Sequence, residues 1–257
     1  MLSLLISGES LAEDRSLGLL AEGTAWETEY TIKDSGEAGP VVMIVGGVHG
    51  NEPAGCRAAE QICDWPITHG KMIVLPRANE PALRAGKRSA PNIEQAAANL
   101  NRNFATAATL SAARGVIAGA IWTLVCDQQP DWLIDLHEGF SFNQMNPKSV
   151  GSSIIVHPSR AARQVAPLMV QAVNETIDDE EKKFVLLGPP INTSLSRAAG
   201  EHLGLNTMIL ETTREDQPLA YRSRQHRIMV HKFLDHLGMI AATVSVDRTA
   251  DLAAAEK

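Results

Sequence analysis

The segment that decides the fold is the run Val41-Val42-Met43-Ile44-Val45-Gly46-Gly47-Val48-His49-Gly50-Asn51-Glu52. Its first five residues are apolar without alternation, which predicts a strand buried on both faces, as in a parallel α/β sheet. The glycines indicate a sharp turn at the carboxyl end of that strand, where open α/β sheets bind ligands. His49 and Glu52 both carry good zinc ligands, so this turn is predicted to supply two ligands of a metal site.

The same glycine-rich turn has a second interpretation, as a cradle for a phosphate group. Two features of the sequence disfavour it. The lysine and hydroxyl residue of a P-loop are absent, and the spacing of the glycines does not fit the dinucleotide-binding pattern Gly-x-Gly-x-x-Gly.

Composition limits the classes of protein to consider. We expect 257 residues to form a single domain over residues 1–257, with its core at about 26–240 and a frayed tail at 241–257. A formal charge of −7 argues against nucleic-acid binding. Three cysteines without CxxC spacing favour reduced thiols and a cytoplasmic location. The apolar start of the chain is too short for a signal sequence or a membrane span, so no membrane association is expected.

Strand-like and helix-like segments alternate along the chain, which predicts a layered α/β fold. Three histidines of the last predicted helix, His226, His231 and His236, are interpreted as surface residues because their spacing of five does not align them. We expect strands at 28–33, 41–45, 71–75, 132–136 and 207–210, and helices at 53–63, 159–177, 194–203 and 219–237, with another helix ending at 121–126.

A second predicted strand also ends in a histidine, in the run Asp135-Leu136-His137. If this strand and the strand before His49 are parallel neighbours, His137 would complete a His, Glu, His set of ligands with His49 and Glu52. Three protein ligands with one open position are typical of catalytic zinc. The alternative for each histidine alone is a hydrogen-bonded structural role.

The irregular segment 76–104 carries several basic side chains on an otherwise acidic protein. Long irregular segments in compact domains are often functional, and guanidinium groups pair well with carboxylates. We interpret the segment as an anion pocket for a substrate carboxylate, with a solvated charged loop as the alternative. Its basic residues are Arg77, Arg84, Lys87, Arg88 and Arg102.

Four ordered motifs carry a family resemblance: His49-Gly50-Asn51-Glu52-Pro53-Ala54-Gly55, Asn99-Leu100-Asn101-Arg102-Asn103-Phe104, Asp135-Leu136-His137 and Leu210-Glu211-Thr212. The chain resembles the zinc carboxypeptidase superfamily, and within it the succinylglutamate desuccinylase and aspartoacylase branch. The resemblance implies a three-layer α/β/α fold around a mixed, mostly parallel sheet of about eight strands. It also implies one zinc ion per chain and hydrolysis of an amide bond beside a carboxylate.

Carried over to this chain, the resemblance assigns zinc binding to His49, Glu52 and His137. It assigns the grip on the substrate carboxylate to Asn101 and Arg102. Glu211 matches the catalytic glutamate, a general base that becomes a general acid; the alternative is a strand-end carboxylate paired with Arg214.

Two further assignments concern the substrate. A cationic donor is required for the tetrahedral oxyanion, and Arg88 is the first choice with Arg84 the second. Tyr221 is a candidate to cap the substrate, with simple packing as the alternative.

Two departures from the family pattern affect the expected function. Asn99 stands where the family usually has aspartate, which predicts a less basic histidine ligand and weaker metal binding. Little sequence follows Ile240 where aspartoacylase-like enzymes carry a further β domain, which predicts a more open cleft. We expect an N-acyl amino acid deacylase. The alternatives are a metallocarboxypeptidase acting on small peptides and a catalytically silent metal-binding protein.

Overall fold

The computed structural model describes residues 14–91, 98–106 and 113–247. They contain one mixed sheet in the spatial order β1-β2-β4-β3-β5-β8-β6-β7. Strands β4, β3, β5 and β8 run parallel at its centre, whereas the pairings β1–β2, β2–β4 and β6–β8 are antiparallel. The strands are β1 (Asp14–Leu20), β2 (Thr28–Asp34), β3 (Val41–Gly46), β4 (Lys71–Leu75), β5 (Trp132–Gly139), β6 (Ser153–Val156), β7 (Val185–Leu187) and β8 (Asn206–Thr213).

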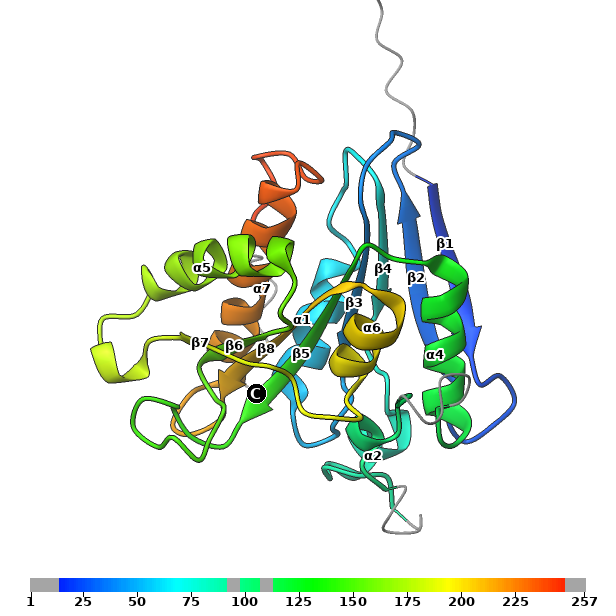
Figure 1. Cartoon of the computed structure of the whole chain (residues 1–257), viewed down its shortest axis with the longest axis horizontal. Coiled ribbons are helices and arrows are strands. Elements are labelled where there is room, and N and C mark those ends of the chain that lie inside the picture. The colour runs from blue at the N-terminus through cyan, green and yellow to red at the C-terminus, as the bar shows by residue number, and fades with distance from the viewer. Residues whose placement is uncertain (1–13, 92–97, 107–112, 248–257) are drawn as a thin grey trace, which may run out of the picture.

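Helices cover both faces of this sheet, so the expected three-layer α/β/α fold is confirmed (Figure 1). Helices α1, α5 and α7 pack on one face, and α4 and α6 pack on the other. The helices and short 3-10 turns are α1 (Pro53–Ile62), α2 (Glu80–Ala85), η1 (Leu100–Arg102), α4 (Val116–Gln128), α5 (Arg160–Asn174), η2 (Glu180–Lys182), α6 (Leu195–Leu203) and α7 (Leu219–His236).

Strand β3 is buried on both faces, as its unbroken apolar run predicts. Val42 and Ile44 pack in the core under α1, α5 and α7. Met43 and Val45 point the opposite way, into the core under α4 and α6. Burying both faces removes more apolar surface from water than a half-exposed strand would, which stabilises the centre of the sheet.

The parallel pairing of β3 with β5 brings the two predicted histidine positions to one edge of the sheet. In this register Gly46, the last residue of β3, lies beside Leu136. Strand β8 continues the same edge, because His137 on β5 is the register partner of Glu211. The turns and strand ends that carry His49, His137 and Glu211 are therefore neighbours.

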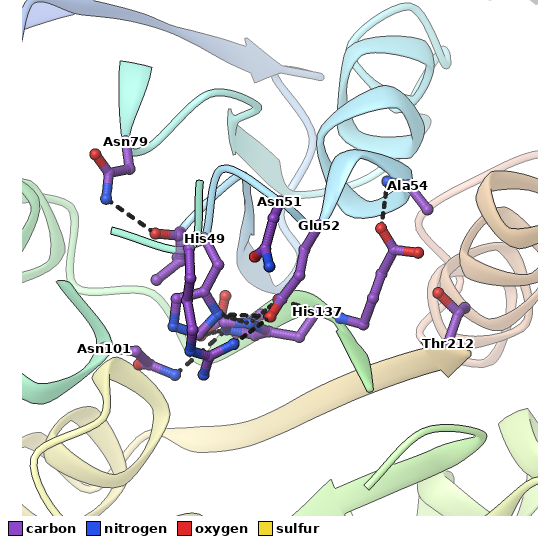
Figure 2. Close-up of polar contacts among 12 residues, drawn as sticks. His49, Asn51, Glu52, Ala54, Asn79, Asn101, His137 and Thr212 are labelled. Atoms are coloured by element: carbon purple, nitrogen blue, oxygen red, sulfur yellow. Dashed lines mark hydrogen bonds and ion pairs between the residues drawn. The ribbon is translucent and has the colours of Figure 1, made fainter. Parts of the chain in front are cut away.

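The turn after β3 needs two of its glycines. Gly47 has φ of +72°, in the left-handed region that favours glycine. A Cβ on Gly50 would lie 2.0 Å from the backbone of Ala82 in α2, so the turn and α2 are in direct backbone contact. Asn79, which precedes α2, strengthens this contact by donating its Nδ2 hydrogen to the carbonyl of Val48 at 3.1 Å (Figure 2).

Several expectations about the fold were wrong. The sheet begins at Asp14 and not near residue 26, because β1 is an edge strand whose Leu17 and Leu19 are exposed and give no buried pattern. Strands β6 and β7 were not expected; they have four and three residues and give little periodicity. The segment 76–104 also contains α2, which was not predicted because the prolines of this segment indicate irregular structure.

The tail and the helix before it also differ from expectation. Residues 241–247 are not frayed, because Val244 is buried and Asp247 pairs with Arg224 on α7 at 2.5 Å; residues 248–257 lie outside the described part. His226 is buried, not on the surface, and its Nε2 lies 3.2 Å from Thr212 Oγ1. His231 is half-buried and His236 is exposed.

Within the described part of the chain, every helix is too short or too polar to cross a membrane. The boundaries of a single domain over residues 1–257 stay a prediction.

Candidate active site

Three buried side chains converge at the edge of the sheet (Figure 2). His49 and Glu52 come from the turn between β3 and α1, and His137 comes from β5. Glu52 Oε1 lies 2.9 Å from His49 Nδ1, and Glu52 Oε2 lies 2.8 Å from His137 Nδ1. The two Nδ1 atoms are 3.1 Å apart. The structure therefore brings together all three predicted metal ligands.

This arrangement fits a divalent metal ion. One potential ligand atom from each residue lies within 4.8 Å of the other two, and all three residues are buried. Two imidazoles and a carboxylate with room for a further ligand are the donor set of catalytic zinc. A cation among them would offset the cost of burying these polar groups together.

Electrostatics in this cluster shift the pKa of each member. Burial would raise the pKa of Glu52, but His49 and His137 outweigh it and hold that pKa well below its ordinary value. Burial would lower the pKa of His137, but the Asp135 and Glu52 carboxylates raise it well above the usual range. For His49, burial dominates and lowers the pKa. Ionised Glu52 and neutral His49 are the forms that bind metals.

Outer hydrogen-bond partners fix both rings with Nδ1 toward the centre. His49 Nε2 lies 3.0 Å from Asn99 Oδ1, the contact that the sequence predicts for Asn99. His137 Nε2 lies 2.9 Å from Asp135 Oδ2. Asp135 was not predicted as a site residue, although residues two apart on a strand share a face and its spacing from His137 could have indicated this contact. Such partners set the tautomer and basicity of a histidine ligand.

Replacing Asn99 with aspartate is expected to tighten metal binding. Asn99 Oδ1 faces His49 Nε2 and accepts the backbone N–H of Asn101 at 3.1 Å. Aspartate keeps both acceptor contacts and adds the charge that makes the imidazole more basic, so zinc should bind ~10-fold or more tightly. Competition with a chelating dye measures this, and Asn99→Ala should shift affinity the other way. Equal affinity in all three proteins would contradict the role of Asn99.

A second buried glutamate, Glu138, forms hydrogen bonds with Glu52 and with the start of α1. The side chain of Glu52 makes no capping hydrogen bond to α1, although Glu52 is the N-cap residue. Glu138 Oε2 instead accepts the N–H of Ala54 at 2.9 Å (Figure 2), and the Glu138 backbone N–H donates to Glu52 Oε2 at 3.2 Å. Glu138 Oε1 is paired with Arg222 on α7. Glu138 thus caps α1 and leaves the Glu52 carboxylate free to face the metal site.

Replacing Glu138 with glutamine is expected to weaken zinc binding by ~10- to 100-fold and to lower thermal stability. The amide can still accept from Ala54, but the Arg222 guanidinium, whose side chain is 11% exposed, loses its charge partner, which is destabilising. Zinc titration and thermal unfolding measure the two effects. Glu201→Gln is the matched control because Glu201 pairs with Arg197 at the surface. Wild-type zinc affinity in Glu138→Gln would contradict this positioning role.

A pocket of about 390 Å³ opens onto the three convergent residues. Glu211 lines it beside His137, one strand away. Burial raises the pKa of Glu211 to about 8, with Glu52 and Asp135 adding to the increase. A carboxyl with a raised pKa next to a metal site suits proton transfer. The alternative pairing of Glu211 with Arg214 does not occur, since Arg214 Nη1 donates to the Asn51 carbonyl at 3.2 Å.

Arg88, Asn101 and Arg102 reach the same pocket. Arg88 Nη1 lies 2.7 Å from Glu52 Oε1, so the guanidinium stands at the metal site. Asn101 Nδ2 lies 3.4 Å from His137 Nε2. Arg102 donates to the Asn101 carbonyl at 2.6 Å. Burial, and then the charge of Arg88, lowers the pKa of Arg102. Both guanidinium groups line the same pocket.

Two predicted residues, Arg84 and Tyr221, are not among the residues that line this pocket, so the structure does not bring them to the site. Arg84 is 74% exposed and pairs with Glu80 one helical turn earlier, which turns it away from the pocket. Tyr221 lies on α7 against a different surface depression, with its hydroxyl 3.5 Å from the Thr176 carbonyl.

Other pocket residues were not anticipated from the sequence. Lys148 and Arg214 add positive charge to the lining. An apolar set also lines it, and its members come from separate strands and loops, so no local pattern links them. These apolar residues are Phe140, Val150, Ile155, Pro189, Ile191 and Ile209.

Comparison of the sequence with curated proteins identifies a relative of known activity. An N-alpha-acetyl-L-2,4-diaminobutyric acid deacetylase of Halomonas elongata is 31% identical over 112 residues. The match covers 42% of this chain and 31% of that protein.

Solved structures share the fold at low sequence identity. Apo cell shape determinant protein Csd4 from Helicobacter pylori superposes with a TM-score of 0.72 at 17% identity, covering 95% of this chain and 59% of Csd4. Csd4 is described as a D,L-carboxypeptidase. A succinylglutamate desuccinylase/aspartoacylase from Rhodobacter sphaeroides gives 0.60 at 19% identity, covering 92% and 69%.

The catalytic domain of the succinylglutamate desuccinylase/aspartoacylase family matches residues 38–237. This range contains all four motifs that carry the resemblance and every residue of the convergent cluster. The chain therefore belongs to this family of hydrolases.

Proposed function

We propose that this protein is a zinc-dependent deacylase that hydrolyses the amide bond of N-acyl amino acids. The convergence of His49, Glu52 and His137 beside Glu211, within one pocket, is the observation that supports it most directly. When bound, a zinc ion would polarise the scissile carbonyl and lower the pKa of a water molecule.

The chain's own residues supply the remaining steps. Asn101 and Arg102 bind the substrate carboxylate and orient the amide, and Arg88 donates to the oxygen that becomes negatively charged. Glu211 takes a proton from the attacking water as the water oxygen bonds to the acyl carbon. As the C–N bond breaks, Glu211 delivers that proton to the leaving nitrogen. The products are a carboxylic acid and a free amino acid.

A carboxypeptidase acting on small peptides is the second candidate. One residue at the rim of the pocket favours a carboxypeptidase, because Phe140 is 52% exposed and leaves room for a longer acyl portion. Both reactions cleave a C–N bond beside a carboxylate, so the same residues would serve.

The proposed location is the cytoplasm. Cys56, Cys63 and Cys126 are all free in the structure. Unpaired thiols are typical of proteins in reducing compartments.

Hydrolysis assays on purified, zinc-loaded protein test the proposal. We expect release of amino acid from N-acetyl amino acids, at a rate that exceeds cleavage of dipeptides. Faster cleavage of dipeptides would favour the carboxypeptidase. Zinc bound at one ion per chain without cleavage of either class would favour the catalytically silent protein.

A further inference from the structure

Four apolar side chains line one side of the active-site pocket, and we call them the apolar wall. They are Ile155, Pro189, Ile191 and Ile209. Ile155 on β6 and Ile209 on β8 are register partners and lie side by side. Their chain neighbours Ile154, Met208 and Leu210 pack in the core under α1, α5 and α7. Since successive strand residues face opposite ways, Ile155 and Ile209 face the pocket.

The apolar wall lies close to the reacting centre. Ile209 precedes Glu211 by two residues on β8, so both side chains are on one face of the sheet, about 6 to 7 Å apart along the strand. A side group that starts next to the scissile bond would need only a few carbon atoms to reach it.

Hydrogen bonds bring the other half of the wall beside the proposed carboxylate grip. Asn101 Oδ1 accepts the N–H of Leu195 at 3.1 Å, and the Phe104 N–H donates to the Thr193 carbonyl at 3.2 Å. The connection from β7 to α6, which carries Pro189 and Ile191, is thereby joined to the segment that carries Asn101 and Arg102. The apolar wall therefore flanks the part of the substrate that bears the carboxylate.

Positive charge in the pocket comes from other elements. Arg214 follows Glu211 by three residues, on the opposite side of Glu211 from Ile209 along the chain, and its guanidinium is held by the Asn51 carbonyl. Lys148 lies in the connection between β5 and β6 and is exposed. The four side chains of the apolar wall offer no donor to a second carboxylate, and burying an unpaired charge against them would be costly.

We propose that the apolar wall binds the side chain of the amino acid that carries the substrate carboxylate. The substrate class is then N-acyl derivatives of branched-chain or aromatic amino acids. This inference rests on the proposed deacylase function, and names the amino acid portion of its substrate.

Substrate comparison tests the inference directly. With zinc-loaded protein, kcat/KM for N-acetyl-leucine should exceed that for N-acetyl-alanine and N-acetyl-glutamate by at least ~10- to 200-fold, the range that a single methylene group provides in an apolar pocket. Preference for N-acetyl-glutamate over N-acetyl-leucine would overturn the inference while leaving the deacylase function intact.

A charge placed on the apolar wall should reverse this preference. Ile191 is 55% exposed, so Ile191→Arg should fold normally and give N-acetyl-glutamate the higher kcat/KM. Leu17→Arg is the matched control because Leu17 is 60% exposed on β1, in the edge strand farthest from β7. Unchanged specificity in Ile191→Arg, with normal thermal unfolding, would also overturn the inference.

Ligand binding separates failure of this inference from failure of the proposed function. Calorimetry on the zinc-loaded protein compares the binding of 4-methylpentanoate with that of glutarate. Both ligands carry one carboxylate; 4-methylpentanoate adds an alkyl group to it, and glutarate adds a second carboxylate. Tighter binding of 4-methylpentanoate supports the apolar wall even if no N-acyl amino acid is hydrolysed. Tighter binding of glutarate contradicts it whether or not hydrolysis occurs.

Discussion

Glu211→Gln is expected to lower kcat by ~100- to 10,000-fold while zinc binding is retained. The amide keeps the size of the side chain but cannot accept a proton from water. Glu211 is not among the three convergent ligands, so the metal site should stay intact. Steady-state hydrolysis and zinc titration of the same preparation measure both properties. Turnover near the wild-type rate would exclude Glu211 as the general base.

The same substitution should stabilise the metal-free fold in a way that depends on pH. The Glu211 pKa is about 8 in the folded protein against an ordinary value of 4.5. Between these values the folded state holds a proton that the unfolded state releases, so ionisation of Glu211 reduces stability as pH rises. The free-energy advantage of Glu211→Gln over wild type should therefore grow from about pH 4.5 to pH 8.

Urea unfolding of both proteins, in chelator, at several pH values measures this difference. Glu215→Gln is the control, because Glu215 is exposed just beyond β8. An advantage that does not change with pH would contradict a buried, protonated Glu211.

His137→Ala is expected to lose stoichiometric zinc and all measurable hydrolysis. His137 contacts Glu52 and His49 at the centre of the cluster, so its removal leaves two of three ligands. Wild-type protein should be stabilised by zinc at 100 times its dissociation constant by ~2.7 kcal/mol, which for a chain of this size is a rise in Tm of about 5 to 10 °C.

Differential scanning calorimetry with and without zinc measures that rise. His236→Ala provides the control, since His236 is exposed at the end of α7. A rise in Tm of the same size in His137→Ala would place the metal elsewhere.

The metal ligands could be predicted from the sequence because each lies near or just beyond the carboxyl end of a buried strand whose type is evident. The mainly apolar runs at 41–45 and 132–136 predict central parallel strands, and parallel neighbours end at the same edge. The family motifs then identified Glu211 and Asn101, which the structure also brings to the pocket.

Other parts of the site depend on contacts that no local pattern records. Glu138 and Arg222 are 84 positions apart, and the exposure of Arg222 depends on how α7 packs. The apolar wall combines one residue of the four-residue strand β6, one residue of β8 and two residues of the loop after β7, so no local periodicity reveals it. The surface position of Arg84 could have been predicted, because Glu80 lies four residues earlier on the same short helix and pairs with it.

The backbone contact between Gly50 and α2 determines how the site is assembled. The N–H groups of Ala78 and Asn79 donate to the Gly46 and Gly47 carbonyls at 2.9 and 3.0 Å, so α2 and the turn form a single rigid block. Arg88 follows α2 by three residues and is carried by this block. The spacing between the metal ligands and the arginine opposite them is thus preset by main-chain packing. Little reorganisation would then be required when a substrate enters, and rigid preorganisation of this kind lowers the barrier to charge development.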